Sequence, residues 1–512
     1  MPILQWVNDG YARRVAQNVP FHLLERIKTY GTSNENGESE NLLVHGDNLI
    51  ALRALLPFYR GRVKCIYIDP PYNTGSAFEH YDDNLEHSKW LSLIYPRLQL
   101  LREFLSDDGS FWLTLDDTEV HYAKVLMDEV MGRNGFVADI TWQKNPTREN
   151  RSDISTTHDH ILLYVRNRTV FKTIRNLLPS SEEQLERFKN PDNDPRGPWA
   201  SLPIHAKADA GRRAEQFYTI TTPGGRVIDP PPGGCWLYTK PRYEEMVADN
   251  RIWFGADGKN APRVKKFLSE VPAGLVPTTI WSCKEVGSNG DAKKEQKDLF
   301  PSASLFDTPK PEQLIRRILH IATNPGDLVL DSFLGSGTTA AVAHKMERRW
   351  IGIEMGEHAK THCIPRLEKV IAGEQGGISQ SVNWQGGGSF TFCELGEPVF
   401  DTWGNINPKV TFATLAAYLW QKETRTTTVP QKAPFLGAAN GVGIYLLYNG
   451  ILGDKAPASG NVLTRKLMKS LLADYPHEGP KIIYADAVVG ITPRELEAAK
   501  ITFKQIPYDV RG

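Results

Sequence analysis

An alternation of strand-like and helix-like segments constrains this chain more than any other feature of its sequence. Between residues 41 and 145, short apolar runs such as "VKCIYID" (63–69) are separated by longer amphipathic runs such as "SKWLSLIYPRLQLLREFL" (88–105). Parallel strands need crossover connections of about a dozen residues or more, and these are usually helices. The pattern therefore predicts an α/β fold with a doubly wound, mostly parallel sheet.

A second α/β stretch begins near residue 309 and contains the strand "LVLDSF" (328–333), the loop "LGSGTT" and the strand "WIGIEM" (350–355). We interpret residues 41–145 and 306–380 as separated halves of one sheet. The irregular, Gly-, Pro- and Trp-rich residues 146–305 between them are expected to form an inserted domain, because compact domains seldom carry so much loop without a functional reason.

The ends of the chain differ from these halves. We expect residues 1–40 to form an N-terminal extension. A Gly-rich segment that ends in "GGGS" (386–389) is interpreted as a linker to a small C-terminal α/β domain at 390–512. That region carries no catalytic signature, so an interaction or structural role is the default expectation for it.

Composition excludes some classes of protein. Lys plus Arg and Asp plus Glu both number 60, so net charge does not indicate a nucleic-acid partner. Residues 140–270 alone hold 21 basic against 16 acidic side chains, an excess typical of a polyanion-binding face or of a solvated surface. The five cysteines form no CxxC pair, and no run of about 18 apolar residues occurs. We expect a reduced, cytoplasmic protein with no membrane partner.

The strand at 63–68 ends in "DPPYNTG" (69–75). Pro70 and Pro71 donate no backbone hydrogen bond, so the strand must stop there and its last carbonyls are left without ladder partners. One interpretation is an ordinary turn, with Asp69 as turn former and Tyr72 as a surface residue. The other is a rigid set of hydrogen-bond acceptors at the end of a strand.

The loop "DSFLGSGTT" (331–339) follows a strand and opens a helix. Gly335 and Gly337 allow a tight turn and the close approach of a ligand, and Glu354 at the end of the next strand can accept hydrogen bonds from ribose hydroxyls. The spacing indicates an adenosine cofactor without saying which, and it also fits a dinucleotide-binding dehydrogenase. Glycines that only ease helix–strand packing are the structural alternative. Thr308 and Lys310 precede a helix whose start can face the same ligand.

Both motifs lie at the carboxyl ends of predicted parallel strands, where open α/β sheets bind ligands. With D-P-P-Y at 69–72 and F-x-G-x-G at 333–337, the sequence resembles the amino-methyltransferases of DNA over roughly residues 41–375. The order of catalytic half, recognition insert and cofactor half matches the permuted β group. Within it the chain resembles the modification subunits of type III restriction systems, including their C-terminal module.

The resemblance implies a class I methyltransferase, Rossmann-like fold and transfer of a methyl group from S-adenosylmethionine to N6 of a flipped-out adenine. Asp69 and the Pro70 carbonyl would accept the amine hydrogens, the two prolines would hold these acceptors rigid, and Tyr72 would stack on the base. Aspartate rather than serine at 69 favours adenine N6 over the alternative, cytosine N4. A non-catalytic DNA-binding subunit is the alternative from another class of protein.

The resemblance also implies sets of binding residues. The cofactor-binding set is Asp331, Phe333, Gly335, Gly337, Thr338, Glu354, Thr308, Lys310 and Asp47, the last of which is equally interpreted as a helix N-cap. Candidates for contact with double-stranded DNA, each with solvent exposure as the alternative, are Arg148, Arg151, Lys259, Arg263, Lys265 and Lys266. The resemblance also implies two protein partners, a helicase-nuclease restriction subunit and a second copy of the chain. It implies a location in the bacterial or archaeal cytosol, near the nucleoid.

Two histidine pairs are candidates for metal ligands. His358 and His362 have helical i, i+4 spacing, but position 359 is Ala where a metalloprotease has Glu. His158 and His160 alternate as on a strand and are not expected to present one ligand face. The expectation from the sequence is therefore no metal.

Overall fold

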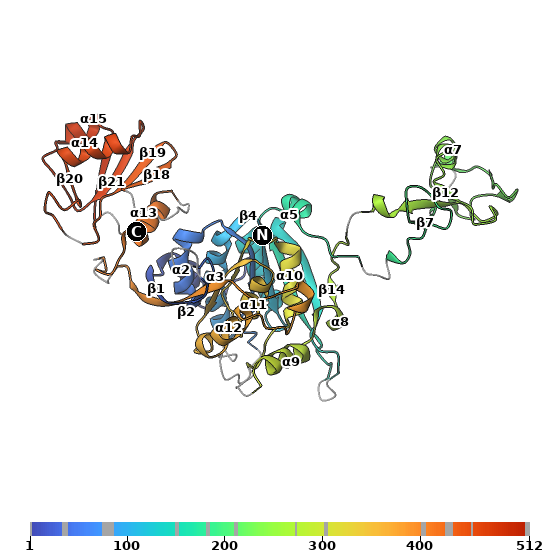
Figure 1. Cartoon of the computed structure of the whole chain (residues 1–512), viewed down its shortest axis with the longest axis horizontal. Helices are drawn as coiled ribbons and strands as arrows, with labels where there is room; N and C mark the ends of the chain where they lie inside the picture. The colour runs from blue at the N-terminus through green and yellow to red at the C-terminus, as the bar shows by residue number, and fades with distance from the viewer. Residues whose placement is uncertain are drawn as a thin grey trace. The chain divides into compact units, whose positions relative to one another are not determined.

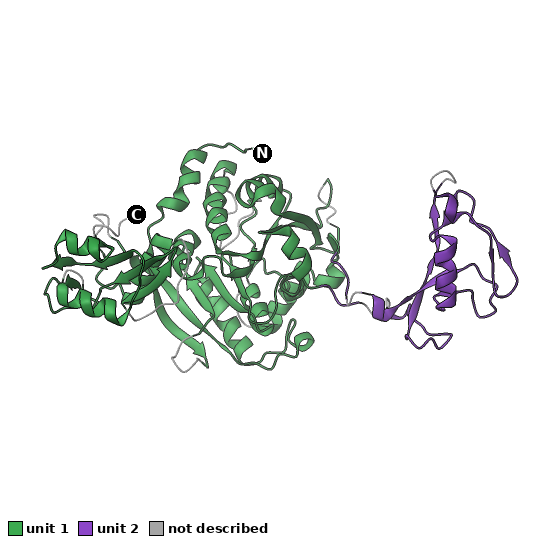
Figure 2. Cartoon of the chain, turned by 90° about the horizontal axis from the view of Figure 1, so that it is seen from above, with its two compact units in different colours: residues 1–176, 278–512 green, residues 177–277 purple. Residues whose placement is uncertain are grey.

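The computed structural model describes residues 3–32, 39–73, 86–148, 153–180, 185–208, 213–271, 274–301, 306–400, 406–424, 434–451 and 454–506. The chain divides into two compact units, residues 1–176 with 278–512 and residues 177–277 (Figure 2). Each unit has its own hydrophobic core.

The elements of the larger unit are shown in Figure 1. Its helices are α1 (Asp9–Asn18), α2 (Asn48–Tyr59), α3 (His87–Phe104), α4 (Val120–Met127), α5 (Arg168–Ile174), α8 (Cys283–Val286), α9 (Asn289–Leu299), α10 (Glu312–Ala322), α11 (Thr338–Lys345), α12 (Ile364–Ile371), α13 (Phe412–Thr424), α14 (Arg465–Asp474) and α15 (Pro493–Ala498). Its strands are β1 (His22–Gly31), β2 (Leu42–His45), β3 (Val63–Ile68), β4 (Leu105–Leu115), β5 (Phe136–Gln143), β6 (His158–Val165), β14 (Ile280–Trp281), β15 (Leu328–Asp331), β16 (Arg349–Glu354), β17 (Ser389–Pro398), β18 (Phe435–Ala439), β19 (Val442–Leu446), β20 (Val462–Thr464), β21 (Lys481–Ala485), β22 (Ala487–Val489) and β23 (Ile501–Gln505).

A ten-stranded sheet in the order β1-β17-β2-β16-β15-β3-β4-β6-β5-β14 forms the centre of the larger unit. Neighbours from β17 to β4 run parallel, whereas β6 runs antiparallel to both β4 and β5. The predicted doubly wound, mostly parallel α/β fold is confirmed. Strand β3 pairs directly with β15, in the register Cys65 with Val329 and Ile66 with Leu330, so the two halves of the sequence form one sheet.

Side-chain alternation along β3 explains why helices cover both faces of this sheet. Ile66 and Ile68 belong to the core that α2 and α3 complete. Cys65 and Tyr67 point the other way and are equally buried. A strand that is buried on both faces has a nearly continuous apolar sequence, which is the pattern expected of a central parallel strand.

The predicted limits of the terminal regions need correction at the sheet edge. Strand β1 lies within residues 1–40, yet it pairs antiparallel with β17, with Gly31 opposite Ser389. Strand β17 in turn pairs parallel with β2. Residues 22–31 and 389–398 are therefore edge strands of the large sheet, and the glycines at 386–388 lead into β17 rather than into a separate domain.

The inserted unit is narrower than the predicted 146–305, because β6, α5, α8 and α9 belong to the larger unit. Its elements are β7 (Trp199–Pro203), β8 (His205–Lys207), β9 (Ile220–Thr221), β10 (Val227–Ile228), β11 (Gly234–Trp236), α7 (Lys240–Ala248), β12 (Ile252–Trp253) and β13 (Arg263–Phe267). A small apolar core that includes Trp236, Tyr243 and Phe254 holds these short elements together.

The C-terminal residues form a second α/β sheet in the order β18-β19-β21-β23. Strands β19, β21 and β23 run parallel, and Ile483 of β21 and Tyr445 of β19 lie in a buried cluster with residues of α14. Among the described helices, none has the length and apolar character needed to cross a bilayer.

Candidate functional site

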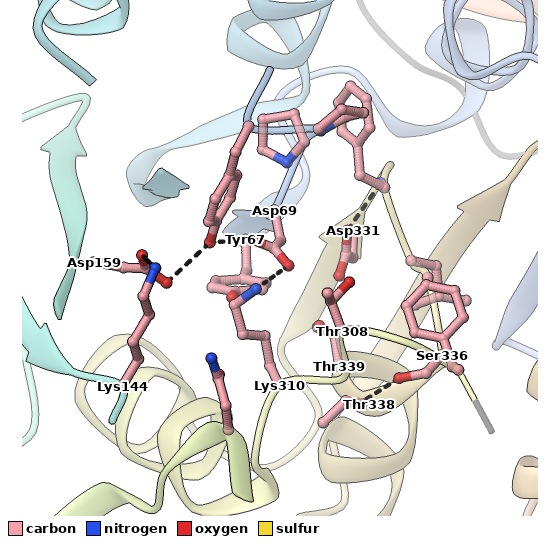
Figure 3. A pocket seen from close by; sticks show the side chains of 18 of the residues that line it. Tyr67, Asp69, Lys144, Asp159, Thr308, Lys310, Asp331, Ser336, Thr338 and Thr339 are labelled. Carbon is pink, nitrogen blue, oxygen red and sulfur yellow. Dashed lines mark hydrogen bonds and ion pairs between the residues drawn. The ribbon is translucent and has the colours of Figure 1, made fainter. Parts of the chain in front are cut away.

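The carboxyl ends of β3 and β15 open into a pocket of about 320 Å³ in the larger unit (Figure 3). Residues of both predicted motifs line it together with side chains from β6 and from the segment before α10. The lining residues are Tyr67, Asp69, Pro70, Pro71, Tyr72, Asp116, Lys144, Asn145, Asp159, Asn289, Phe306, Thr308, Lys310, Asp331, Phe333, Leu334, Gly335, Ser336, Thr338 and Thr339.

Asp69 is the centre of a hydrogen-bonded group at the end of β3. The Tyr72 hydroxyl lies 2.8 Å from Asp69 Oδ1, and the Lys310 ammonium contacts Asp69 Oδ2. Lys310 also lies 5.1 Å from the centre of the Tyr72 ring. Burial and the nearby Asp159 and Asp69 carboxylates raise the pKa of Tyr72 well above its usual value, so its hydroxyl remains a donor.

The carbonyl groups of the two prolines differ in their hydrogen bonding. The Trp90 indole N–H on α3 donates to the Pro71 carbonyl over 2.7 Å, which fastens the loop to the helix beneath it. Among the described residues, no hydrogen bond reaches the Pro70 carbonyl, so this acceptor stays available beside Asp69.

Asp159 and Lys144 are pocket residues that sequence reasoning missed. Asp159 on β6 is 2% exposed; its Oδ1 accepts from the Lys144 ammonium at 2.6 Å, and its Oδ2 lies 3.3 Å from the Tyr72 hydroxyl. Burial raises the pKa of Asp159, although Lys144 opposes the shift. No motif marks these two residues. Asp159 reaches the pocket because β6 pairs antiparallel with β4. Lys144 directly follows β5, which pairs antiparallel with β6.

The glycine loop forms the opposite wall of the pocket. Gly335 and Gly337 have φ angles of 56° and 81°, and Gly337 precedes the first turn of α11. An added Cβ at Gly335 would lie 3.4 Å from the Phe306 ring, in ordinary van der Waals contact, so a side chain larger than a methyl group would extend into the space beside that ring. Asp331 accepts from the Phe333 N–H at 2.9 Å, and burial raises the pKa of Asp331 to about 7.

Glu354 is outside the pocket lining and is engaged by the protein itself. Its Oε2 accepts from the Gly335 N–H at 2.7 Å, and its Oε1 lies 2.9 Å from His358 Nε2. Burial alone would raise the pKa of Glu354, but the hydrogen bonds from His358 and from the Gly356 and Gly335 N–H groups lower it overall. In this structure the acid shapes the glycine loop rather than facing the pocket.

Some of the remaining predicted cofactor residues line the pocket and others do not. Thr308, Lys310, Phe333 and Thr338 line the pocket, whereas Gly337 and Asp47 do not. Asp47 caps α2 by accepting from the Leu49 N–H at 2.8 Å and pairs with Arg97 at 3.1 Å. The N-cap interpretation of Asp47 therefore describes its contacts.

The predicted DNA-contacting residues have different environments. Lys259, Arg263 and Lys266 of the inserted unit and Arg148 of the larger unit are exposed, and Arg151 lies outside the described residues. Lys265 is a correction: it is 1% exposed, and its ammonium contacts Asp192 and lies 3.1 Å from Asp194 Oδ2. A lysine held in this way is part of the core of the insert and cannot reach a phosphate.

Comparison with known proteins agrees with both motifs. A family described as DNA methylase matches residues 63–364. The type III restriction-modification enzyme StyLTI Mod subunit from Salmonella typhimurium is 35% identical over 369 residues, which cover 66% of this chain and 55% of that subunit. The type II methyltransferase M1.MboII from Moraxella bovis is 60% identical over 294 residues, 57% of this chain and 84% of that protein.

Among solved structures, the PvuII DNA methyltransferase (cytosine-N4-specific) covers 65% of this chain and 91% of its own, with 16% identity and a TM-score of 0.35. The chain spans about half the length of two type III subunits that it matches, 55% of the StyLTI subunit and 54% of the HindVI subunit.

Proposed function

Because this chain belongs to the DNA methylase family, we propose that it transfers a methyl group from S-adenosylmethionine to N6 of an adenine extruded from double-stranded DNA. The observation that carries the proposal is the pairing of β3 with β15. This pairing brings Asp69 and Gly335 into the lining of one pocket. A methyl donor on the glycine loop and an amine at Asp69 would then be neighbours.

The pocket residues fit such a donor. Gly335 has no side chain to occupy the pocket, Phe306 and Phe333 supply apolar walls, and Asp331 adds a carboxyl group to the lining. S-adenosylmethionine supplies a methyl group on a positively charged sulfur. The family match also leaves the dehydrogenase interpretation of the glycine loop without support.

The acceptors at Asp69 and Pro70 explain how the target amine is prepared. An exocyclic amine is a poor nucleophile, because its lone pair is delocalised into the ring. Hydrogen bonds from the amine to the Asp69 carboxylate and the Pro70 carbonyl favour a pyramidal nitrogen and free that lone pair. Lys310 contacts Asp69 in this structure, so the amine must share or replace that contact.

Tyr72 is suited to hold the extruded base. An atom inside a duplex cannot be reached, so the base must leave the stack and find a new face. The Tyr72 hydroxyl is held between Asp69 and Asp159, at 2.8 Å and 3.3 Å. These contacts fix the position of the hydroxyl end of the ring before the base arrives. The exposed Lys259, Arg263, Lys266 and Arg148 are candidates for the phosphate contacts that keep the DNA bound.

We further propose that the chain is a modification and recognition subunit that works with a helicase-nuclease partner and a second copy of the chain. The observation behind this proposal is that the StyLTI and HindVI relatives are named Mod subunits of type III restriction-modification enzymes. A second candidate is a methyltransferase that works alone, since M1.MboII, named a type II enzyme, is 60% identical over 84% of its length. Turnover by the purified chain without any partner favours the second candidate, and turnover that requires a partner favours the first.

The test is transfer of labelled methyl groups to unmethylated DNA, followed by digestion to nucleosides and chromatography. We expect label in N6-methyladenine; label in N4-methylcytosine would keep the mechanism and change the base. Asp69→Ala should lower turnover by about 100- to 1000-fold, as loss of one preorganised polar partner does, and leave cofactor affinity unchanged. Asp107→Asn, at a fully exposed carboxylate, is the matched control. Wild-type turnover in Asp69→Ala would contradict the assignment.

A further inference from the structure

Two histidines of strand β6 lie close to Asp117, on the side of the strand that faces away from the methyl-transfer pocket. His158 and His160 are two residues apart on the strand, so their side chains point to the same face, and their ring centres are 5.0 Å apart. The expectation that they would not share a face was therefore wrong. Asp159 lies between them in sequence and faces the pocket instead.

Asp117, in the turn after β4, completes the group. Its Oδ1 lies 3.0 Å from His160 Nε2 and 3.8 Å from His158 Nε2. One ligand atom from each of the three residues falls within 4.8 Å of the others. Ligands at about 2.0–2.2 Å from a metal ion stand roughly 3 to 3.5 Å from one another, so small side-chain rotations suffice to place all three around one ion.

Asp139 on β5 adds a second and independent feature of a metal site. Both of its carboxylate oxygens lie close to His160 Nδ1, at 3.0 Å and 3.1 Å. A carboxylate that accepts from one ring nitrogen fixes the histidine tautomer, orients the ring and makes the other nitrogen a better ligand. Here the other nitrogen is Nε2, which faces Asp117.

The charges and ligand types indicate which ion would bind. Asp117 and Asp139 carry two negative charges beside two imidazoles, so a divalent cation would balance the group. Imidazole nitrogens suit zinc and neighbouring transition metals, whereas magnesium and calcium prefer oxygen ligands. His158 retains 34% of its side-chain exposure and Asp117 53%, which leaves open positions for water.

We propose that Asp117, His158 and His160 form a binding site for one divalent transition-metal ion of the zinc class, with Asp139 as the carboxylate behind His160. Three elements meet there: the turn after β4, strand β6 and strand β5. A bound ion would fasten them to one another and restrain the strand whose opposite face presents Asp159 to the pocket. The metal site does not depend on the proposed methyl transfer.

The test uses the full chain without an affinity tag, stripped with a chelator and dialysed against low micromolar zinc or cobalt. We expect one bound ion per chain by mass spectrometry of the metal, a histidine-type cobalt absorption spectrum, and a rise in the melting temperature. His158→Ala and His160→Ala should each abolish the cobalt spectrum. Asp139→Asn, which keeps every ligand, should weaken binding by roughly 10- to 100-fold.

Two control variants separate this site from other ligands. His205→Ala removes an exposed histidine of the inserted unit, and Cys283→Ser removes a partly exposed thiol; both should bind metal as the wild type does. If a ligand variant misfolds by circular dichroism, Asp139→Asn still decides the question. Absence of bound metal in the wild type, or unchanged binding in both histidine variants, would overturn the proposal.

Discussion

Adjacent lysines of β13 in the inserted unit should respond to substitution in opposite ways. The Lys265 ammonium is completely buried, contacts Asp192 and lies 3.1 Å from the equally buried Asp194 Oδ2. Lys266 points outward with 46% of its side chain exposed and a 3.9 Å approach to Glu270. We predict that Lys265→Met destabilises the insert, whereas Lys266→Met weakens DNA binding without loss of stability.

The expected cost of Lys265→Met follows from this geometry. Opposite charges 3.1 Å apart attract by about 5 kcal/mol at an effective dielectric constant of about 20. Removing one partner of a buried pair costs about 3–5 kcal/mol, because the other charge remains buried and uncompensated. Arg196 still donates to Asp194 at 2.9 Å, and Met keeps an apolar stem of similar length beside Trp199. We therefore expect the lower end, about 3 kcal/mol.

The assay is hydrogen exchange of the full chain, followed in peptides that contain β7 and β13. A loss of about 3 kcal/mol corresponds to a roughly 100-fold faster exchange of amides that open with the local unit. Peptides from β3 and β15 should exchange as in the wild type, because these strands belong to the other unit. Lys266→Met is the matched control and should leave exchange in β13 unchanged.

DNA binding supplies the second half of the comparison. If Lys266 contacts a phosphate, Lys266→Met should lower affinity for all sequences alike and reduce the slope of log affinity against log salt by about 1. Unchanged exchange of β7 and β13 in Lys265→Met would refute the argument from burial. It would mean that the two carboxylates do not depend on this ammonium.

Two further predictions concern the pocket. Gly335→Val should lower S-adenosylmethionine affinity at least tenfold by calorimetry, because an added Cβ would lie 3.4 Å from Phe306 and the two methyl groups of Val would extend beyond it. Gly326→Val is the control for backbone strain: Gly326 has a φ of 82°, and an added Cβ there would meet no atom within 4 Å. This variant should bind S-adenosylmethionine normally. Asp331 has a folded pKa of about 7, raised by burial, against about 3.9 in an unfolded chain, so its contribution to stability is present below pH 4 and is lost as the pH rises through 7. Asp331→Asn should flatten that part of the melting temperature profile, and an unchanged profile would contradict the burial argument.

The sequence allowed the centre of the fold and of the pocket to be predicted, because both depend on local signals. The runs that end in Asp69 and Asp331 are apolar throughout, and the carboxyl ends of parallel strands meet at one edge of a sheet. If residues 41–145 and 306–380 form one sheet, the ends of both strands, and with them Asp69 and Asp331, are expected at the same edge of that sheet. The pairing of β1 with β17 has no such signal, since its partners are hundreds of residues apart and either strand could have paired elsewhere.

Burial of charged residues was equally hard to predict. Lys265 stands in the run "RVKKF" beside an exposed lysine, and nothing in that run distinguishes the two. Its partners Asp192 and Asp194 lie more than 70 residues earlier. Only the folded insert shows which of the two ammonium groups meets the carboxylates.

Strand β6 shows how one stretch of sequence can serve two sites. Alternation dictates that Asp159 faces away from His158 and His160, and this much could be read from "HDH" alone. Pairing with β4 decides which face of β6 lines the pocket beside Asp69. In this pairing His160 stands opposite Leu115 and so lies next to the turn that carries Asp117. The same register that sends Asp159 to Tyr72 therefore sends the two imidazoles to Asp117. A shift of one residue in the pairing of β6 would exchange the two faces and dismantle both groups together.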